Sequence, residues 1–155
     1  MKLANRLMNW GAQVMIETPV RKLTIQELIL QLEQSAVDIL ERLKASPDSP
    51  GNRRELCHII GIERWGQRRL RVALGEPFLT EEYDHYRPSI ECPWDDLTKD
   101  WDATRQGTLT LARDLDKVNP PTEFTINHNI YGPLSVKGWL RYLDLHASSE
   151  GKRIK

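Results

Sequence analysis

Apolar side chains recur at helical spacing along four separate stretches of this 155-residue chain, and this periodicity constrains the fold more than any other feature. The first stretch opens with Thr24-Ile25-Gln26-Glu27. This is a capping box, in which the Thr24 hydroxyl can accept a hydrogen bond from the backbone N–H of Glu27 and the Glu27 side chain can reach back. The apolar positions that follow are Ile25, Leu28, Ile29, Leu32, Ala36, Ile39, Leu40 and Leu43. They predict a helix that ends near Ala45, before a loop at 46–52 that holds two prolines and a glycine.

Three further helices follow from the same periodicity and from the residues that interrupt it. The second is expected at about residues 53–74, because Gly75-Glu76-Pro77 ends it. The third is opened by Pro93 and broken at Asn119-Pro120-Pro121. The fourth starts after Ser135, which can cap its first turn.

The segments between these helices predict long loops and almost no strand. Residues 78–92 are polar and aromatic and indicate a long loop, and residues 123–127 alternate only weakly between apolar and polar. Residues 23–155 are therefore expected to form one all-α domain, a four-helix bundle with long loops between its helices.

Residues 1–22 are interpreted as an N-terminal extension ahead of this domain. Leu3, Leu7 and Trp10 lie at helical spacing and predict a short helix, which Pro19 ends. The first six residues lack a continuous apolar core, so they do not resemble a signal peptide.

The composition argues against several classes of partner. Lys and Arg number 22 and Asp and Glu number 22, so the net charge is zero and gives no general attraction to nucleic acid or to an anionic membrane. No apolar run approaches the roughly 20 residues that a membrane-spanning helix needs. Cys57 and Cys92 have neither metal-type spacing nor a disulfide framework, which favours reduced thiols in a cytoplasmic protein.

Two potential metal ligands lie on the inner face of the fourth helix. If Trp139 faces the core, His146 and Glu150 fall one turn apart in the same apolar stripe. A carboxylate in that place is costly unless it is paired, protonated or bound to a cation. The alternative is a helix end at which Glu150 already reaches water, because Gly151 follows it.

The second helix adds His58, which lies in an apolar segment and can be either a metal ligand or a hydrogen-bonded core residue. Glu63 falls near the centre of that helix's inner stripe and needs a partner if it is buried. Arg105 of the third helix is the candidate partner. A Glu63–Arg105 pair can be purely structural, or it can orient a metal ligand through contacts outside the coordination sphere. His85 and His128 lie in loops and are expected to be exposed.

Together, His58, His146 and Glu150 would make a three-ligand set. Two imidazoles and one carboxylate suit zinc, nickel or iron, and such a set leaves coordination positions open for water or substrate. The spacing alone is weakly specific, because an HxxxE pair arises often by chance. No HExxH motif, glycine-rich phosphate loop, GxSxG or CxxC accompanies it.

Three segments resemble the DinB/YfiT-like superfamily of metal-dependent four-helix bundles. Residues 56–65 (LCHIIGIERW) are similar to the family's His-hydrophobic-x-x-x-Glu segment on its second helix. Residues 94–105 are similar to the start of the third helix with its inward Arg. Residues 128–146 are similar to the family's His-Pro-x-x-Gly-x-Leu-Thr loop, which leads into the final helix and its HxxxH pair. The three matches occur in the family's order and at its spacing. The resemblance covers roughly residues 24–155.

The resemblance implies a metal held by three histidines, of which two carry over as His58 and His146. The third position is Glu150, which either serves as an oxygen ligand or marks a site that has been lost. The resemblance also implies a homodimer. Among activities it implies thiol-dependent transfer or hydrolysis, in which the ion activates a low-molecular-weight thiol or a water molecule.

Two functions of different classes follow. The first is a metal-dependent thiol transferase or small-molecule hydrolase, in which Glu63 and Arg105 support the metal ligands. The second is a non-catalytic, metal-free dimeric module for binding or stress response, whose interface could draw on the five tryptophans.

Overall fold

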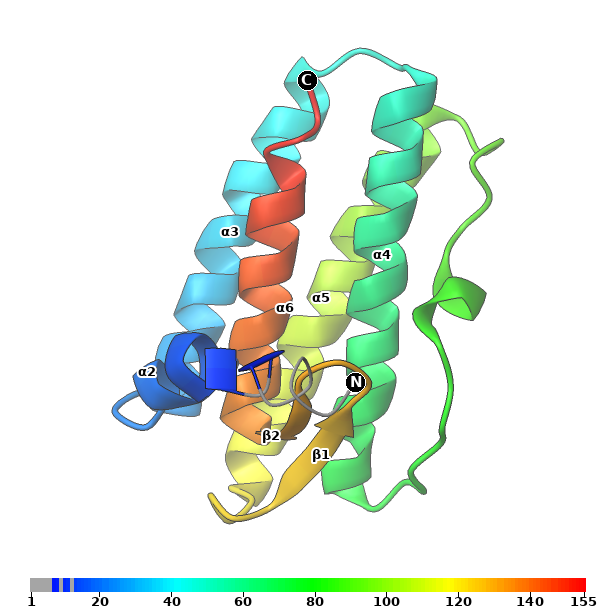
Figure 1. The fold of residues 1–155 in the computed structure, drawn as a ribbon. Coiled ribbons are helices and arrows are strands. Elements are labelled where there is room, and N and C mark those ends of the chain that lie inside the picture. Colours follow the sequence, from blue (N-terminus) through cyan, green and yellow to red (C-terminus); the bar gives the residue numbers. More distant parts are fainter. Residues whose placement is uncertain (1–6, 9, 12) are drawn as a thin grey trace.

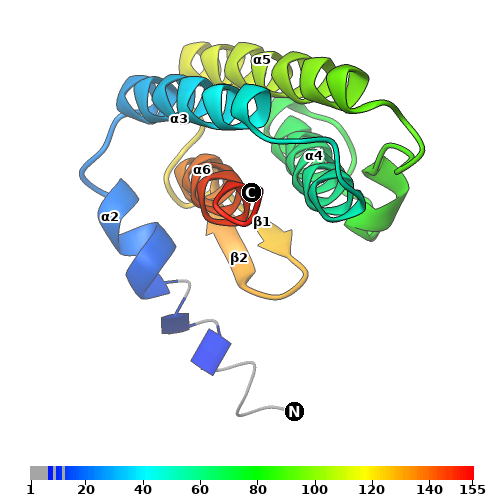
Figure 2. The ribbon, with the colours of Figure 1, turned by 90° about the horizontal axis from the view of Figure 1, so that it is seen from above.

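Four long helices account for most of the chain in the computed structural model, which describes residues 7, 8, 10, 11 and 13–155 (Figure 1). They are α3 (Ile25–Ala45), α4 (Pro50–Leu70), α5 (Trp94–Val118) and α6 (Val136–Gly151). Helix α5 packs against α3 and α4, and α6 packs against the same two helices. Seen from above, α3 and α5 lie side by side in one layer, with α4 and α6 beneath them (Figure 2). The expected all-α class is thereby confirmed.

The starts of α3 and α4 show how local sequence sets the helix ends. The capping box at Thr24 is present: the backbone N–H of Glu27 donates to Thr24 Oγ1 at 3.1 Å, and the backbone N–H of Thr24 donates to Glu27 Oε2 at 2.7 Å. Helix α4 begins at Pro50 and not near residue 53, so the expected loop at 46–52 is three residues too long. The reason is that Ser49 accepts from the N–H of Asn52, and proline is well suited to the first helical position, where its missing N–H costs nothing.

Helix α4 ends close to the predicted place. It tightens into a 3₁₀ turn at Arg71–Leu74, and Gly75 ends it with a left-handed φ of 97°. The following long segment contains one further 3₁₀ turn, Tyr83–Tyr86, and runs along the outer side of α4 (Figure 1). Trp65 Nε1 and Arg69 both donate to the carbonyl of Glu81, which ties this segment to α4.

A small antiparallel hairpin precedes α6. Strand β1 (Thr125–His128) pairs with β2 (Gly132–Ser135), so that Ile126 lies opposite Leu134. The sequence predicted only a weak first strand; the second was missed because its four residues, Gly-Pro-Leu-Ser, carry little strand propensity. Ser135 accepts from the N–H of Gly138 at 3.0 Å, and the predicted cap of α6 is confirmed.

Apolar side chains fill the space between the four helices in two clusters, and most of the tryptophans lie in them. Trp65, Trp94, Trp101 and Trp139 are each at most 7% exposed. These four side chains therefore stabilise the interior and are not available for the aromatic surface patch that the sequence suggested. Trp10 is the exposed one, at 67%.

The N-terminal segment lies against α6. Its described part contains the π-helical turn Gln13–Glu17 and the short helix α2 (Thr18–Val20), whereas Leu3 lies outside the described residues. The Glu17 carboxylate accepts from the backbone N–H of Ser135 at 2.7 Å and from its hydroxyl, and it lies so close to Gly138 that a Cβ there would displace it. Within the described part of the chain, no helix is both long and apolar enough to cross a bilayer.

Candidate functional site

Two of the three predicted ligands meet between facing helices. His58 on α4 and His146 on α6 place their Nε2 atoms 3.2 Å apart. A metal ion binds imidazole nitrogen at about 2.0–2.1 Å, so two histidines on one ion hold their nitrogens about 3 Å apart. The separation of this pair is therefore that of two ligands of one ion, and it is also that of a direct N–H···N hydrogen bond.

The environment keeps both imidazoles neutral. Burial, followed by the effect of the neighbouring His58, lowers the pKa of His146 to about 4. Burial also lowers the pKa of His58, and the charge of Arg87 acts in the same direction. Neutral imidazole is the form of histidine that binds a metal. At neutral pH, metal binding therefore releases no proton from an imidazolium of this pair.

Arg87 sets which nitrogen of His58 carries the proton. The Arg87 guanidinium lies 3.1 Å from His58 Nδ1, and because a guanidinium can only donate, Nδ1 accepts. Neutral His58 then holds its proton on Nε2 and donates it to Nε2 of His146. Coordination through Nε2 of His58 would require the other tautomer and the displacement of Arg87.

Glu150, the third predicted ligand, is directed to a different partner. Its Oε2 lies 2.7 Å from the guanidinium of Arg153, and its side chain is 17% exposed. Glu55 forms a hydrogen bond with it; burial first, and then this contact, raises the pKa of Glu55. Among the residues that the structure describes, no group of three or more His, Cys, Asp and Glu side chains is arranged to hold a metal ion. The spacing of the two histidines thus fits a metal, whereas the tautomer of His58 and the rotamer of Glu150 do not.

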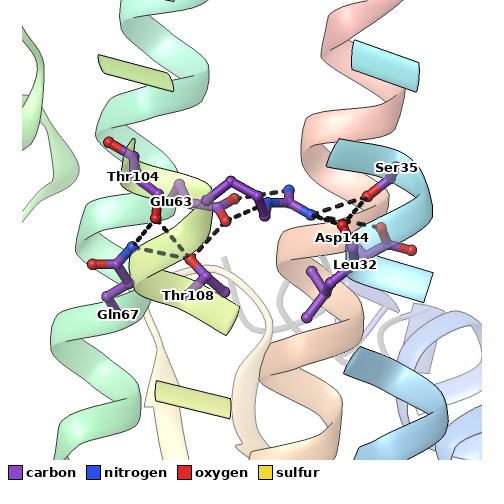
Figure 3. A network of polar contacts seen from close by, with 8 residues as sticks. Leu32, Ser35, Glu63, Gln67, Thr104, Thr108 and Asp144 are labelled. Carbon is purple, nitrogen blue, oxygen red and sulfur yellow. Dashed lines mark hydrogen bonds and ion pairs between the residues drawn. The ribbon is translucent and has the colours of Figure 1, made fainter. Parts of the chain in front are cut away.

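Glu63 and Arg105 form the buried ion pair that their helical phase predicted (Figure 3). Arg105 Nε lies 2.8 Å from Glu63 Oε1, and the two side chains are 0% and 1% exposed. Thr108 donates to Glu63 at 2.7 Å, and Gln67 donates in turn to Thr108 and to the carbonyl of Thr104. On the other side, Arg105 donates to Ser35 and to the carbonyl of Leu32, both on α3.

This network is separate from the histidine pair. Every hydrogen bond that Glu63 and Arg105 make within the described residues goes to the partners above, and none goes to His58 or His146. Asp144 on α6 is the nearest link: its Oδ1 lies 3.9 Å from Arg105, and it belongs to the turn that precedes His146. The predicted support of the ligands by direct contact is therefore not seen.

His128 is buried, and the prediction that it would be exposed is wrong. It is 3% exposed, because it ends strand β1 on the inner side of the hairpin, where the rings of Trp65, Tyr131, Trp139 and Tyr142 surround it. Its Nδ1 accepts from the N–H groups of Ile130 and Tyr131, and burial lowers its pKa to about 3. The weak strand signal at 123–127 was the clue that His128 belongs to ordered structure.

Two hollows of opposite character border the histidine pair. The basic hollow, of about 650 Å³, is lined by His58 and Glu55 and by the cations Arg54, Arg87, Arg153 and Lys155. The apolar hollow, of about 560 Å³, is lined by His146 and Glu150 together with Tyr131, Tyr142, Leu145 and the N-terminal segment. Sequence reasoning missed Arg87 and Tyr142 as neighbours of the site. It could have found Arg153, which lies one turn beyond Glu150.

Comparisons with protein-family models, with curated proteins and with solved structures found no match for this chain.

Proposed function

We propose that this chain is a DinB-like four-helix bundle and a metal-dependent enzyme, a thiol transferase or a small-molecule hydrolase. In this proposal His58 and His146 hold a zinc, nickel or iron ion and Glu150 completes the set. The observation that carries the proposal is the pair of neutral imidazoles whose Nε2 atoms lie 3.2 Å apart across two helices. Neutral histidines brought together at this distance are typical of a metal site.

Two local contacts compete with the ion, and both are weak. Arg153 is 67% exposed where it pairs with Glu150, and Arg87 is 36% exposed where it lies against Asp84 and His58. Exposed ion pairs contribute about 0–1 kcal/mol, which is far less than coordination of a divalent cation contributes. The competing contacts therefore lower the affinity for metal but do not exclude binding.

The chemistry of the site follows from its neighbours. A bound divalent cation lowers the pKa of a coordinated thiol or water toward neutrality, which generates a nucleophile. Burial and the neighbouring Glu150 raise the pKa of Glu55, so the Glu55 carboxyl group holds a proton more readily than a free one in the hollow that His58 lines. Two separate hollows border the pair, and this favours a transferase, which must bind two substrates, over a hydrolase.

Metal uptake tests the proposal directly. Protein dialysed free of metal is incubated with zinc, nickel or ferrous iron, desalted, and analysed by inductively coupled plasma mass spectrometry. We expect near-stoichiometric metal in the wild type and its loss in His58→Ala and in His146→Ala. The matched control is His85→Ala, which removes an exposed histidine outside the pair. A folded wild-type protein that takes up none of the three ions would overturn the proposal.

The second candidate function is a metal-free, dimeric binding or stress-response module. It is favoured by the ion pair of Glu150 with Arg153 and by the contact of Arg87 with His58, which satisfy the candidate ligands without an ion. Sedimentation velocity on the same samples separates the two candidates. A stable dimer that takes up no metal supports the module, and metal bound by the histidine pair supports the enzyme.

A further inference from the structure

The apolar hollow beside His146 is built from one face of α6. Tyr142, Leu145, His146, Ser149 and Glu150 line it, and they recur at intervals of three and four residues. Tyr142 and Leu145 give the start of this stripe its apolar surface, whereas its later part carries Ser149 and, from the proposed metal site, His146 and Glu150. A ligand in the hollow would thus contact apolar side chains along its length and the metal site at one end.

The opposite wall comes from the N-terminal segment. Met8, Gly11, Met15 and Ile16 line the hollow, and Met15 is held in place because Arg141 of α6 donates to its carbonyl at 3.1 Å. Gly11 leaves space there: a Cβ built on it meets nothing within 4 Å. Methionine side chains are flexible and polarisable, so they adapt to apolar ligands of different shapes.

The wall of this hollow contains the phenol group of Tyr142. Tyr142 is 8% exposed and lines the hollow, and within the described part of the chain no hydrogen bond of its hydroxyl group is found. Burial raises the pKa of Tyr142, so its hydroxyl keeps its proton and remains a donor. A ligand that carries an acceptor would take this donor in place of water.

We propose that the apolar hollow binds the substrate of the metal site, and that this substrate is a neutral, mainly apolar small molecule with a carbonyl-type hydrogen-bond acceptor directed at Tyr142. The volume of about 560 Å³ falls within the range of small-molecule pockets. An apolar lining with few polar groups is also typical of such pockets. The inference rests on the proposed function in one respect only, that the ligand lies next to an ion held by His146.

The test uses two fluorescent probes on the metal-free protein. Prodan is neutral and apolar and carries a ketone; N-phenyl-1-naphthylamine is of similar apolar character and lacks a carbonyl. We expect Prodan to bind at one saturable site per chain. The substitution Ser149→Trp fills the hollow from an exposed position of α6 and should weaken Prodan binding at least about tenfold. The matched control, Thr110→Trp, adds the same side chain at an exposed position of α5 and should leave binding unchanged.

The variant Tyr142→Phe tests the acceptor. Loss of one neutral hydrogen bond should weaken Prodan binding about 2–10-fold and leave N-phenyl-1-naphthylamine unaffected. Met15→Glu, which places a charge at the exposed rim of the hollow, serves as a second variant if Ser149→Trp does not fold. Prodan that does not saturate, or that binds Ser149→Trp and Met15→Glu as tightly as the wild type, would overturn the inference.

Paramagnetic Ni²⁺ distinguishes the failure of this inference from the failure of the metal proposal. If the hollow lies beside an ion held by the pair, Ni²⁺ should quench bound Prodan in the wild type and not in His58→Ala. Prodan binding without nickel uptake leaves the hollow a ligand site and removes the metal proposal. Nickel uptake without Prodan binding does the reverse.

Discussion

The Glu63–Arg105 network, which joins α4 to α5 and α3, and the His58–His146 pair, which joins α4 to α6, are both polar clusters between packed helices, but they differ in how their groups are satisfied. In the network, charge is matched by charge at complete burial, and hydroxyl and carbonyl groups supply the remaining partners. In the pair, two neutral imidazoles face each other at partial burial, and the nearby charges come from exposed arginines. The first arrangement fixes its partners by buried charge, whereas the proposed function requires the second to exchange a partner for an ion. Burial of a polar group therefore does not by itself mark a functional site.

The largest expected effect is in the network. The substitution Arg105→Met leaves Glu63 buried without its cation and should lower the free energy of unfolding by about 3–5 kcal/mol. Arg113→Met is the control, because Arg113 pairs with Glu33 at the surface with 48% of its side chain exposed, and its loss should cost less than about 1 kcal/mol. Urea unfolding at pH 7 measures both. Equal losses in the two variants would show that the buried ion pair stabilises the fold no more than a surface pair does.

The next effect belongs to the histidine pair. Zinc at about one hundred times its dissociation constant should stabilise the wild type by about 2.7 kcal/mol, because it binds the folded chain and not the unfolded one. For a chain of this size we expect the melting temperature to rise by roughly 5–10 °C, and chelator should reverse the rise. His146→Ala should show no such rise. A melting temperature that zinc leaves unchanged in the wild type would mean that the pair resembles the network in being purely structural.

The buried imidazole of His128 should make stability depend on pH. Burial lowers its pKa to about 3 in the folded state from about 6.5 in the unfolded state, so the unfolded chain binds more protons between these values. The contribution of His128 is complete above pH 6.5 and is lost as the pH falls toward 3, with about 2 kcal/mol lost by pH 5. Unfolding of the wild type and of His128→Asn at pH 7 and pH 5 measures this loss. The variant should lack it, and an equal pH dependence in both proteins would assign the effect to other groups.

The smallest effect concerns the competition at Glu150. The substitution Arg153→Ala frees the carboxylate from an exposed ion pair, so the affinity for zinc should rise by up to about fivefold. Competition with a zinc-sensitive dye measures it, and Lys152→Ala controls for the loss of one exposed positive charge on the same turn. A lower affinity for zinc in Arg153→Ala would show that Arg153 orients the Glu150 carboxylate toward the ion and does not compete with the ion for it.

The helices, and the inward positions of Glu63 and His146, could be predicted because they depend on local periodicity. The meeting of His58 and His146 was expected only from the three-ligand set and the family resemblance, because the period of one helix does not fix its contacts with another. The phase of α4 placed Glu63 inward and the phase of α6 placed His146 inward. Arg105 was the candidate partner of Glu63 because it too lies on the inner face of its helix. Arg87 could not be predicted, because its place depends on how the long segment after α4 is tied down by Trp65 and Arg69 at the carbonyl of Glu81. Such contacts join residues that no local pattern relates.

The rotamer of Glu150 lay beyond prediction for a different reason. Helical spacing fixes the direction of its Cα–Cβ bond but not the choice between two partners, His146 within the site and Arg153 at the surface. The same limit applies to His128: the register of β1 against β2 decides that its ring faces inward, and register was not readable from so short a strand.

The close approach of Glu17 to Gly138 has a consequence for the evolution of the chain. A side chain at 138 would push the Glu17 carboxylate away from the hydrogen bonds that attach the N-terminal segment to the start of α6. A lineage that loses the segment also loses the requirement for glycine at 138, and a lineage that keeps it does not. Among related sequences, an acidic residue at 17 and glycine at 138 should be gained and lost together, although 120 intervening residues separate them.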